Sequence, residues 1–282
     1  MAIDYEAEYN NRARVPGHPQ IFARWEKDSA DYREAMRRED SLELGLKYGP
    51  GERQTVDLFF PEASGKGPLA VFLHGGYWRS LGPGLFSHMA AGLVTRGVAV
   101  AVVGYDLCPQ VTIADIIDET RRACLFLWNR FGQRLMVYGH SAGGHLAAAM
   151  LATDWKSLDR NTPSNLVPAA YSISGLFDLT PLTGISMNQD LKLTAEAART
   201  VSPIFWPAPK GLALDAVVGA LESEEFLRQS RIIAEAWSKG GATARYQALA
   251  GANHFTAIDP LTDPQSAMVE RLVGLARHCA RF

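Results

Sequence analysis

The stretch "RLMVYGHSAGGHLAAAMLA", residues 134–152, decides the fold of this chain of 282 residues. It sets Gly139-His140-Ser141-Ala142-Gly143, a Gly-x-Ser-x-Gly pattern, between an apolar run and an alanine-rich run. The first run predicts a buried strand and the second a helix. A serine at such a strand-to-helix turn sits on a tight, strained bend and can act as a nucleophile. The alternative is an idle serine in a glycine-rich turn.

A nucleophilic serine needs a base within hydrogen-bond reach and an acid that orients the base. After a serine elbow, the acid and then the histidine follow in chain order. His254, in the loop after the predicted strand 244–251, is the candidate base, because His278 falls inside the predicted last helix. Glu222 is the candidate acid, since it follows the predicted strand 214–221 directly. Other acids lie at that strand's start or in the next helical turn, where they suit the helix dipole: Asp215, Glu224 and Glu225.

A tetrahedral intermediate also needs hydrogen-bond donors for its oxyanion. The stretch "HGGYW", residues 74–78, follows the predicted strand at 69–73 and forms a glycine-rich loop. Glycine lets the backbone approach a substrate closely. We therefore expect the N–H groups of Gly76, Tyr77 and Ala142 to form an oxyanion hole, the alternative being an ordinary glycine turn.

Strands and helices alternate along the chain from residue 54 onwards. Apolar or alternating runs predict strands near residues 54–60, 69–73, 98–106, 134–141, 169–175, 214–221 and 244–251. Helical periodicity appears in between, near residues 112–131, 143–153, 223–240 and 264–280. This order predicts an α/β fold with a mostly parallel sheet of at least six strands and helices on both faces.

The chain divides into an N-terminal extension and one large domain. Residues 1–50 predict one or two amphipathic helices, centred on residues 18–40, that pack on the body. Residues 51–282 predict a single domain. Within it, residues 176–213 are rich in proline and contain no clear strand, so we expect a small lid above the carboxyl edge of the sheet.

Composition excludes several classes of function. A net charge of -2 and a pI near 6.4 do not favour a nucleic-acid partner. No apolar run is long enough to span a membrane, and the acidic N-terminus does not resemble a signal peptide. The three cysteines lie far apart, so we expect reduced thiols, a cytoplasmic location and no metal site. No cofactor motif is visible, and the sequence leaves a homodimer open.

These motifs together resemble the α/β-hydrolases, and among them the arylformamidase (kynurenine formamidase) group and its bacterial esterase-like relatives. The resemblance rests on His-Gly-Gly-x-Trp at residues 74–78, "GHSAGGHLAA" at the elbow, "SISGLFDLTPL" at residues 172–182 and "NHF" at residues 253–255. It covers residue 50 to the end, and "EYNNRARVP" near the N-terminus is similar as well. Glu222 stands where family members usually carry aspartate.

The resemblance implies a serine hydrolase that cleaves a small aromatic formamide, such as N-formylkynurenine, through an acyl-enzyme. It assigns the nucleophile to Ser141, the base to His254 and the acid to Glu222. The alternatives are a carboxylesterase acting on small aryl or alkyl esters, a hydrolase of another amide, imide or thioester, and a catalytically silent binding relative. The substrate pocket is expected to contain His74, Gly75, Trp78, His140, Phe205 and Trp206, the last two facing an aromatic leaving group.

Overall fold

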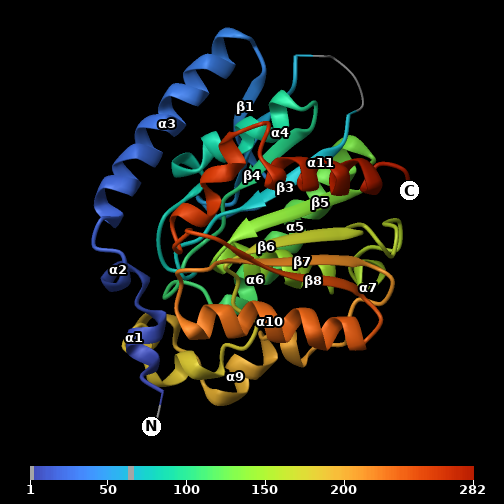
Figure 1. The fold of residues 1–282 in the computed structure, drawn as a ribbon. Helices are drawn as coiled ribbons and strands as arrows, with labels where there is room; N and C mark the ends of the chain where they lie inside the picture. The colour runs from blue at the N-terminus through green and yellow to red at the C-terminus, as the bar shows by residue number, and fades with distance from the viewer. Residues whose placement is uncertain (1–2, 63–66) are drawn as a thin grey trace.

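A computed structural model describes residues 3–62 and 67–282, and a twisted sheet of eight strands runs through its centre (Figure 1). The strands are β1 (Leu42–Lys47), β2 (Thr55–Phe59), β3 (Leu69–Leu73), β4 (Ala99–Val103), β5 (Leu135–His140), β6 (Ala169–Ile173), β7 (Ala213–Gly219) and β8 (Thr243–Leu249). Their order is β1-β2-β4-β3-β5-β6-β7-β8, and every pair from β4 to β8 is parallel. β1 and β2 pair antiparallel at one edge. The predicted α/β class with a mostly parallel sheet is confirmed.

Helices cover both faces of this sheet. They are α1 (Tyr5–Tyr9), α2 (Asn11–Arg14), α3 (His18–Arg38), α4 (Ala91–Thr95), α5 (Ile113–Phe131), α6 (Ala142–Leu151), α7 (Trp155–Leu158), α8 (Asn188–Leu191), α9 (Ala195–Thr200), α10 (Glu224–Lys239) and α11 (Ala267–Cys279). Short 3₁₀ turns lie at Pro83–Leu85, Ser87–Ala90, Thr180–Gly184, Pro203–Phe205 and Thr256–Thr262. Three long helices begin at side-chain caps, which accept backbone N–H groups: Thr112, Ser223 and Ser266.

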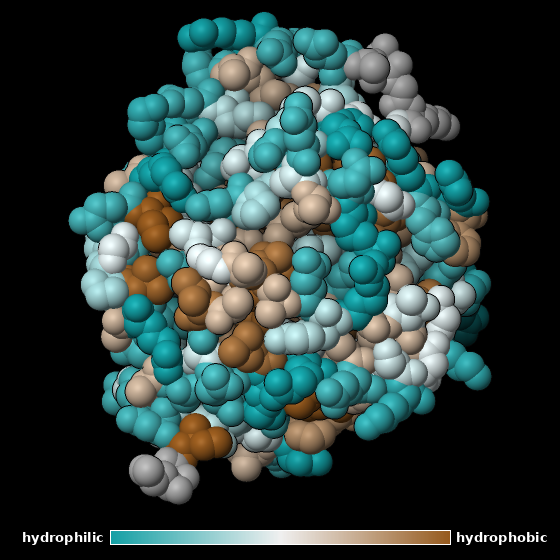
Figure 2. Space-filling view, viewed as in Figure 1, coloured by the Kyte–Doolittle hydropathy of each residue, from teal (hydrophilic) through white to brown (hydrophobic). Residues whose placement is uncertain are grey.

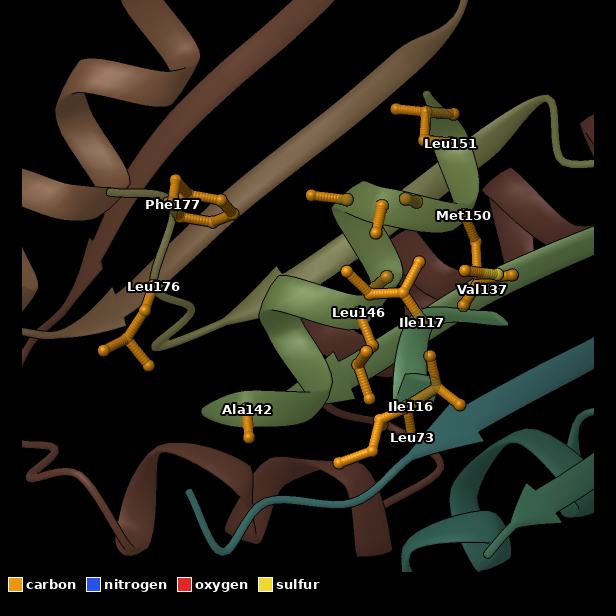
Figure 3. Close-up of a cluster of buried hydrophobic side chains, with 14 of the residues drawn as sticks. Leu73, Ile116, Ile117, Val137, Ala142, Leu146, Met150, Leu151, Leu176 and Phe177 are labelled. Atoms are coloured by element: carbon orange, nitrogen blue, oxygen red, sulfur yellow. The ribbon is translucent and has the colours of Figure 1, made fainter. Parts of the chain in front are cut away.

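Two apolar cores fix the sheet between its helical layers. α5, α6 and α10 bury side chains on one face, and α3, α4 and α11 bury theirs on the other. Figure 3 shows the first core, where Leu146 and Met150 of α6 lie beside Ile116 and Ile117 of α5 and Val137 of β5. α6, the helix that follows the serine, is buried along its whole length. This core therefore fixes the strand-to-helix turn rigidly.

The N-terminal region differs in part from the sequence expectation. The amphipathic helix predicted around residues 18–40 is present as α3, with Trp25 and Met36 buried. However, β1 lies within residues 1–50 and joins the sheet, so this range is not purely helical. The alternation in "LELGLK" is a strand signal that the prediction missed. Gly45, at a positive φ of 69°, lies where the β1–β2 register shifts.

The segment 176–213 contains two 3₁₀ turns together with α8 and α9, and no strand until β7 begins at its last residue. Most of its apolar side chains are buried against the body. The segment is therefore packed as a part of the body. Its role as a small lid over the carboxyl edge of the sheet stays a prediction.

Figure 2 shows that the face seen in Figure 1 is mostly hydrophilic. The apolar patches of this face gather on the left, between α3 and α10, over the carboxyl ends of the parallel strands. In open α/β sheets, this edge is where ligands bind.

Candidate active site

Ser141 lies at the end of β5 on a strained turn. Its φ of 58° and ψ of -117° are unfavourable for a residue with a side chain. The two flanking glycines are required by close approach: a Cβ at Gly139 would lie 2.3 Å from the Gly143 oxygen, and one at Gly143 would lie 1.9 Å from the Leu73 oxygen. The spacing Gly-x-Ser-x-Gly is thus the steric condition for this bend.

Three side chains from separate loops meet at the carboxyl edge of the sheet. Ser141 Oγ lies 3.1 Å from His254 Nε2, and His254 Nδ1 lies 2.6 Å from Glu222 Oε2. The structure therefore brings together the three residues that the sequence predicts as nucleophile, base and acid. A hydroxyl, an imidazole and a carboxylate in this line can activate the serine as a nucleophile.

Glu222 is fixed by two further donors on its other oxygen. The Ser174 hydroxyl and the Gly219 N–H both donate to Oε1, over 2.5 Å and 2.7 Å. Oε2 is thereby left to His254 alone. The Glu222 side chain, which contacts His254, is fully buried. The longer glutamate side chain spans from its loop to the imidazole with both oxygens satisfied.

His140 supports the loop that carries the base. Its Nε2–H donates to the His254 carbonyl oxygen over 2.8 Å, and the two rings lie 4.8 Å apart. Burial, with His254 nearby, holds the pKa of His140 well below its usual value. A neutral ring with its proton on Nε2 satisfies this bond. Phe226 packs on the same His254 ring from α10, with the centroids 4.7 Å apart.

The loop at residues 74–78 lies beside the serine in an unusual backbone conformation. Gly76, Tyr77 and Trp78 have successive positive φ values of 115°, 51° and 55°. A Cβ at Gly76 would lie 2.1 Å from the Ser80 oxygen, so only glycine fits there. Within residues 3–62 and 67–282, the amides of Gly76, Tyr77 and Ala142 donate to no protein acceptor. The predicted oxyanion donors are therefore available to a ligand.

A cleft of about 610 Å³, counting its mouth, opens over Ser141 and His254. Its walls combine the oxyanion loop and the residues that follow it, the N-terminal segment, the loops after β5 and β8, and Met187 of the segment 176–213. The remaining lining residues are Tyr9, Asn10, Asn11, Arg12, Phe22, Trp25, Gly75, Gly76, Tyr77, Arg79, Ser80, Leu81, Phe86, His140, Met187 and Phe255. The aromatic side chains among them suit an aromatic ligand.

Four predicted pocket residues lie outside these walls, so their assignment to the pocket is wrong. His74 is buried behind the loop, with its ring centroid 4.2 Å from that of Tyr105. Trp78 is fully buried against His145, with the ring centroids 5.0 Å apart. Phe205 is 43% exposed and packs on the Arg199 guanidinium, while Trp206 donates to the Thr200 carbonyl. An aromatic residue in a nearby segment need not face the site.

The N-terminal wall is the part of the site that sequence reasoning missed. Tyr9 to Arg12, in the stretch "EYNNRARVP", and Phe22 and Trp25 of α3 reach the cleft from a region assigned only to packing. The resemblance of this stretch to the family's N-terminus was the available signal. No local pattern in this stretch shows that it reaches a cleft built from loops far along the chain.

The two arginines in the wall differ in their partners. Arg79 forms an ion pair with Asp190. Arg12 forms no ion pair in the part of the chain that the structure describes, and its guanidinium lies 5.8 Å from the Phe22 ring centroid. Arg12 is thus the wall's positive charge available to an anionic ligand.

The described residues contain no group of three His, Cys, Asp or Glu side chains that could hold a metal ion. The three cysteines are buried and unbridged. No helix in this part of the chain is long and apolar enough to cross a bilayer.

Comparison with known proteins gives consistent results. The BD-FAE family model matches residues 56–204. Kynurenine formamidase from Salmo salar is 32% identical over 241 residues, which cover 82% of this chain and 81% of that protein. Kynurenine formamidase from Drosophila melanogaster is 32% identical, covering 76% of this chain and 75% of that protein.

Solved structures agree on the fold. A candidate thioesterase from Silicibacter sp. tm1040 has a TM-score of 0.84 at 33% identity and covers 95% of this chain and 98% of that one. An esterase from Pyrobaculum calidifontis has a TM-score of 0.71 at 17% identity, with 93% of each chain covered. At that identity, the second likeness concerns the fold alone.

Proposed function

We propose, from the premise that this chain belongs to the BD-FAE family and to the arylformamidase-like α/β-hydrolases, that it hydrolyses a small aromatic formamide of the N-formylkynurenine type. The observation that carries the proposal is the Ser141–His254–Glu222 line, with its 3.1 Å and 2.6 Å contacts beneath an aromatic-walled cleft. The likeness to kynurenine formamidases over most of the chain supports the choice of substrate.

The reaction follows from the positions of these groups. His254 takes the proton of Ser141 as the hydroxyl attacks the formyl carbon, and Glu222 stabilises the imidazolium that forms. The oxyanion accepts hydrogen bonds from the free amides of Gly76, Tyr77 and Ala142. His254 then gives its proton to the departing amine. Water resolves the formyl-enzyme by the same route and releases formate.

The side chains that line the cleft suit an aromatic leaving group with a negative charge. Phe22 and Trp25 come from α3, Phe86 from a 3₁₀ cap and Phe255 from the loop of the base. Arg12 adds a cation with no carboxylate partner in the described part of the chain. A guanidinium can bind a carboxylate through two parallel hydrogen bonds. We therefore infer a formamide of an arylamine that carries an acid group.

A side-by-side comparison of specificity constants tests this proposal. The purified protein would be assayed with N-formylkynurenine and with p-nitrophenyl acetate. We expect kcat/KM for the formamide to reach at least about 10⁴ M⁻¹s⁻¹, the lower end of the usual enzyme range. A value below about 10² M⁻¹s⁻¹ for the formamide, with a faster ester reaction, would reject the formamidase in favour of the esterase.

The second candidate is a carboxylesterase acting on small aryl or alkyl esters. The same three residues would perform it, and fold does not fix the substrate. The likeness to a candidate thioesterase at 33% identity supports hydrolysis of an ester-type substrate. We place the protein in the cytoplasm, with a small molecule as its partner, and three buried thiols agree with a reducing compartment. Light scattering of the purified protein would decide between a monomer and a homodimer.

A further inference from the structure

A segment near the N-terminus lines the cleft and docks on α10. We call residues 4–14, which contain α1 and α2, the N-terminal strap; it lies at the lower left of Figure 1, beside the start of α10. Glu6 accepts from the Ser186 N–H and hydroxyl over 2.7 Å and 2.6 Å. Glu8 accepts from the Glu225 N–H over 3.0 Å. Both ends of α1 are thus tied to the body.

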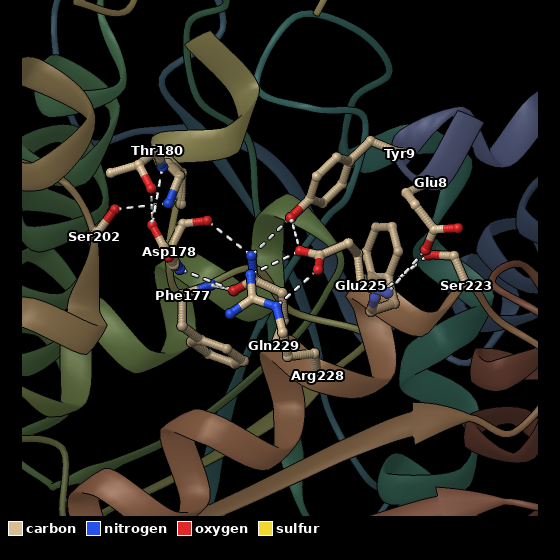
Figure 4. Close-up of polar contacts among 12 residues, drawn as sticks. Glu8, Tyr9, Phe177, Asp178, Thr180, Ser202, Ser223, Glu225, Arg228 and Gln229 are labelled. Atoms are coloured by element: carbon tan, nitrogen blue, oxygen red, sulfur yellow. Dashed lines mark hydrogen bonds and ion pairs between the residues drawn. The ribbon is translucent and has the colours of Figure 1, made fainter. Parts of the chain in front are cut away.

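The central anchor of the strap is a buried tyrosine. Tyr9 is fully buried, and its hydroxyl donates to Glu225 Oε2 over 2.8 Å and accepts from Gln229 Nε2 over 2.9 Å (Figure 4). Gln229 in turn bonds to the backbone of Phe177 and Asp178. Moving Tyr9 would leave several buried polar groups unpaired, which is costly in a protein interior. The position of the strap is therefore well determined.

This anchored strap holds the oxyanion loop through the side chain of Tyr77. The Tyr77 hydroxyl donates to the Tyr9 carbonyl oxygen over 2.7 Å and accepts from Asn11 Nδ2 over 3.3 Å. Burial raises the pKa of Tyr77 well above its usual value, so the phenol keeps the proton that it donates. These two bonds fix the far end of a residue that lines the cleft and whose own N–H donates to no acceptor in the described part of the chain.

The loop needs such support because of its conformation. Tyr77 and Trp78 follow Gly76 at positive φ, a backbone region that is unfavourable for residues with a side chain. Strained backbone persists only where the surrounding structure determines it. The strap can hold this strained loop in place through its hydrogen bonds to the Tyr77 side chain.

We propose that the N-terminal strap is a positioning element of the catalytic centre: the Tyr9 carbonyl and the Asn11 amide hold the Tyr77 phenol and so aim the Tyr77 N–H at the oxyanion. The inference rests on the oxyanion role given to Tyr77 in the proposed function. Tyr9 and Asn11 act through Tyr77 and are positioning residues. The effect belongs to the transition state, because the oxyanion exists only there.

The variant Tyr77→Phe tests this by removing only the hydroxyl. The full chain would be assayed on p-nitrophenyl acetate, so that the result is independent of the formamide question. We expect kcat to fall about tenfold with KM unchanged, a part of the 10²- to 10³-fold loss that follows removal of a whole donor. The affinity of an arylboronic acid, which mimics the tetrahedral state, should fall by a similar factor. Asn11→Ala should shift both quantities in the same direction by a smaller amount.

A matched control separates positioning from general packing. The Tyr48 hydroxyl also donates a hydrogen bond to a backbone carbonyl oxygen, that of Gly104, over 2.7 Å. Tyr48 does not line the cleft. Tyr48→Phe should lower the melting temperature as much as Tyr77→Phe and leave kcat unchanged. The proposal is overturned if Tyr77→Phe keeps the wild-type kcat and boronate affinity, or if Tyr48→Phe lowers kcat equally. Failure of the formamide assay alone would reject the substrate and leave this result standing.

Discussion

Glu222→Gln is the substitution whose outcome the site geometry fixes most closely. Glutamine has nearly the shape of glutamate, so the perturbation is one of charge and proton donors. Oε1 of Glu222 receives two hydrogen bonds, from Ser174 and Gly219, and only an oxygen can accept them. The amide oxygen of glutamine must therefore take that side. Its NH₂ group then faces His254 Nδ1 across the former 2.6 Å contact.

An NH₂ donor at this place reverses the tautomer of the His254 imidazole. Nδ1 must accept, so the ring proton moves to Nε2, which then faces Ser141 as a donor and cannot take its proton. The imidazolium also loses its counter-charge in a buried site. Comparable substitutions in triads cost about 10³- to 10⁴-fold in kcat, or about 4–5.5 kcal/mol. We expect a loss of this size for Glu222→Gln.

The assay is steady-state hydrolysis of p-nitrophenyl acetate, with a thermal melt to show that the variant is folded. Glu224→Gln is the matched control, because Glu224 lies two residues away and is exposed. We expect that control to keep its activity within about twofold, as surface changes away from special features are nearly neutral. If Glu222→Gln retains more than about a tenth of the wild-type kcat, the acid lies elsewhere and the reasoning is refuted.

Three further changes probe other parts of the structure. Ser174→Ala removes a donor to the Glu222 carboxylate and should lower kcat about tenfold, since such charged bonds are worth about 1.5 kcal/mol; an unchanged kcat would contradict this. N-formylanthranilate carries a carboxylate that formanilide lacks, so Arg12→Gln should lower kcat/KM for the first about tenfold more than for the second. Equal losses would show that Arg12 does not bind an acid group of the substrate. Burial raises the pKa of Glu119 to about 7, so its protonated form is favoured in the folded state. Urea unfolding should therefore show stability falling as pH rises from about 5 to 7, and Glu119→Gln should flatten that slope, whereas parallel slopes would exclude Glu119 as the cause.

The catalytic residues could be predicted because each one lies in the loop or turn that follows a strand. Parallel strands end at one edge of a sheet, so residues that follow β5, β7 and β8 converge there whatever the details of packing. Ser141, Glu222 and His254 meet for this reason. The flanking glycines were equally readable, since the elbow has a steric condition that a sequence displays.

The walls of the cleft could not be predicted in the same way. Tyr9 reaches the site through a buried network with Glu225 and Gln229, more than 200 residues away, which no local pattern encodes. Phe205 and Trp206 were chosen for their aromatic character, but their orientation depends on Arg199 and the Thr200 carbonyl. The site's chemistry follows from topology, whereas its shape follows from tertiary contacts.

Formate release from N-formylkynurenine, measured with the wild type and with Ser141→Ala, shows whether Ser141 is the nucleophile of a formamidase. We expect rapid release by the wild type. We expect a loss of about 10⁴-fold or more for the variant, because the oxyanion donors remain and the nucleophile is gone. Formate release by Ser141→Ala at a rate near that of the wild type would show that Ser141 is not the nucleophile.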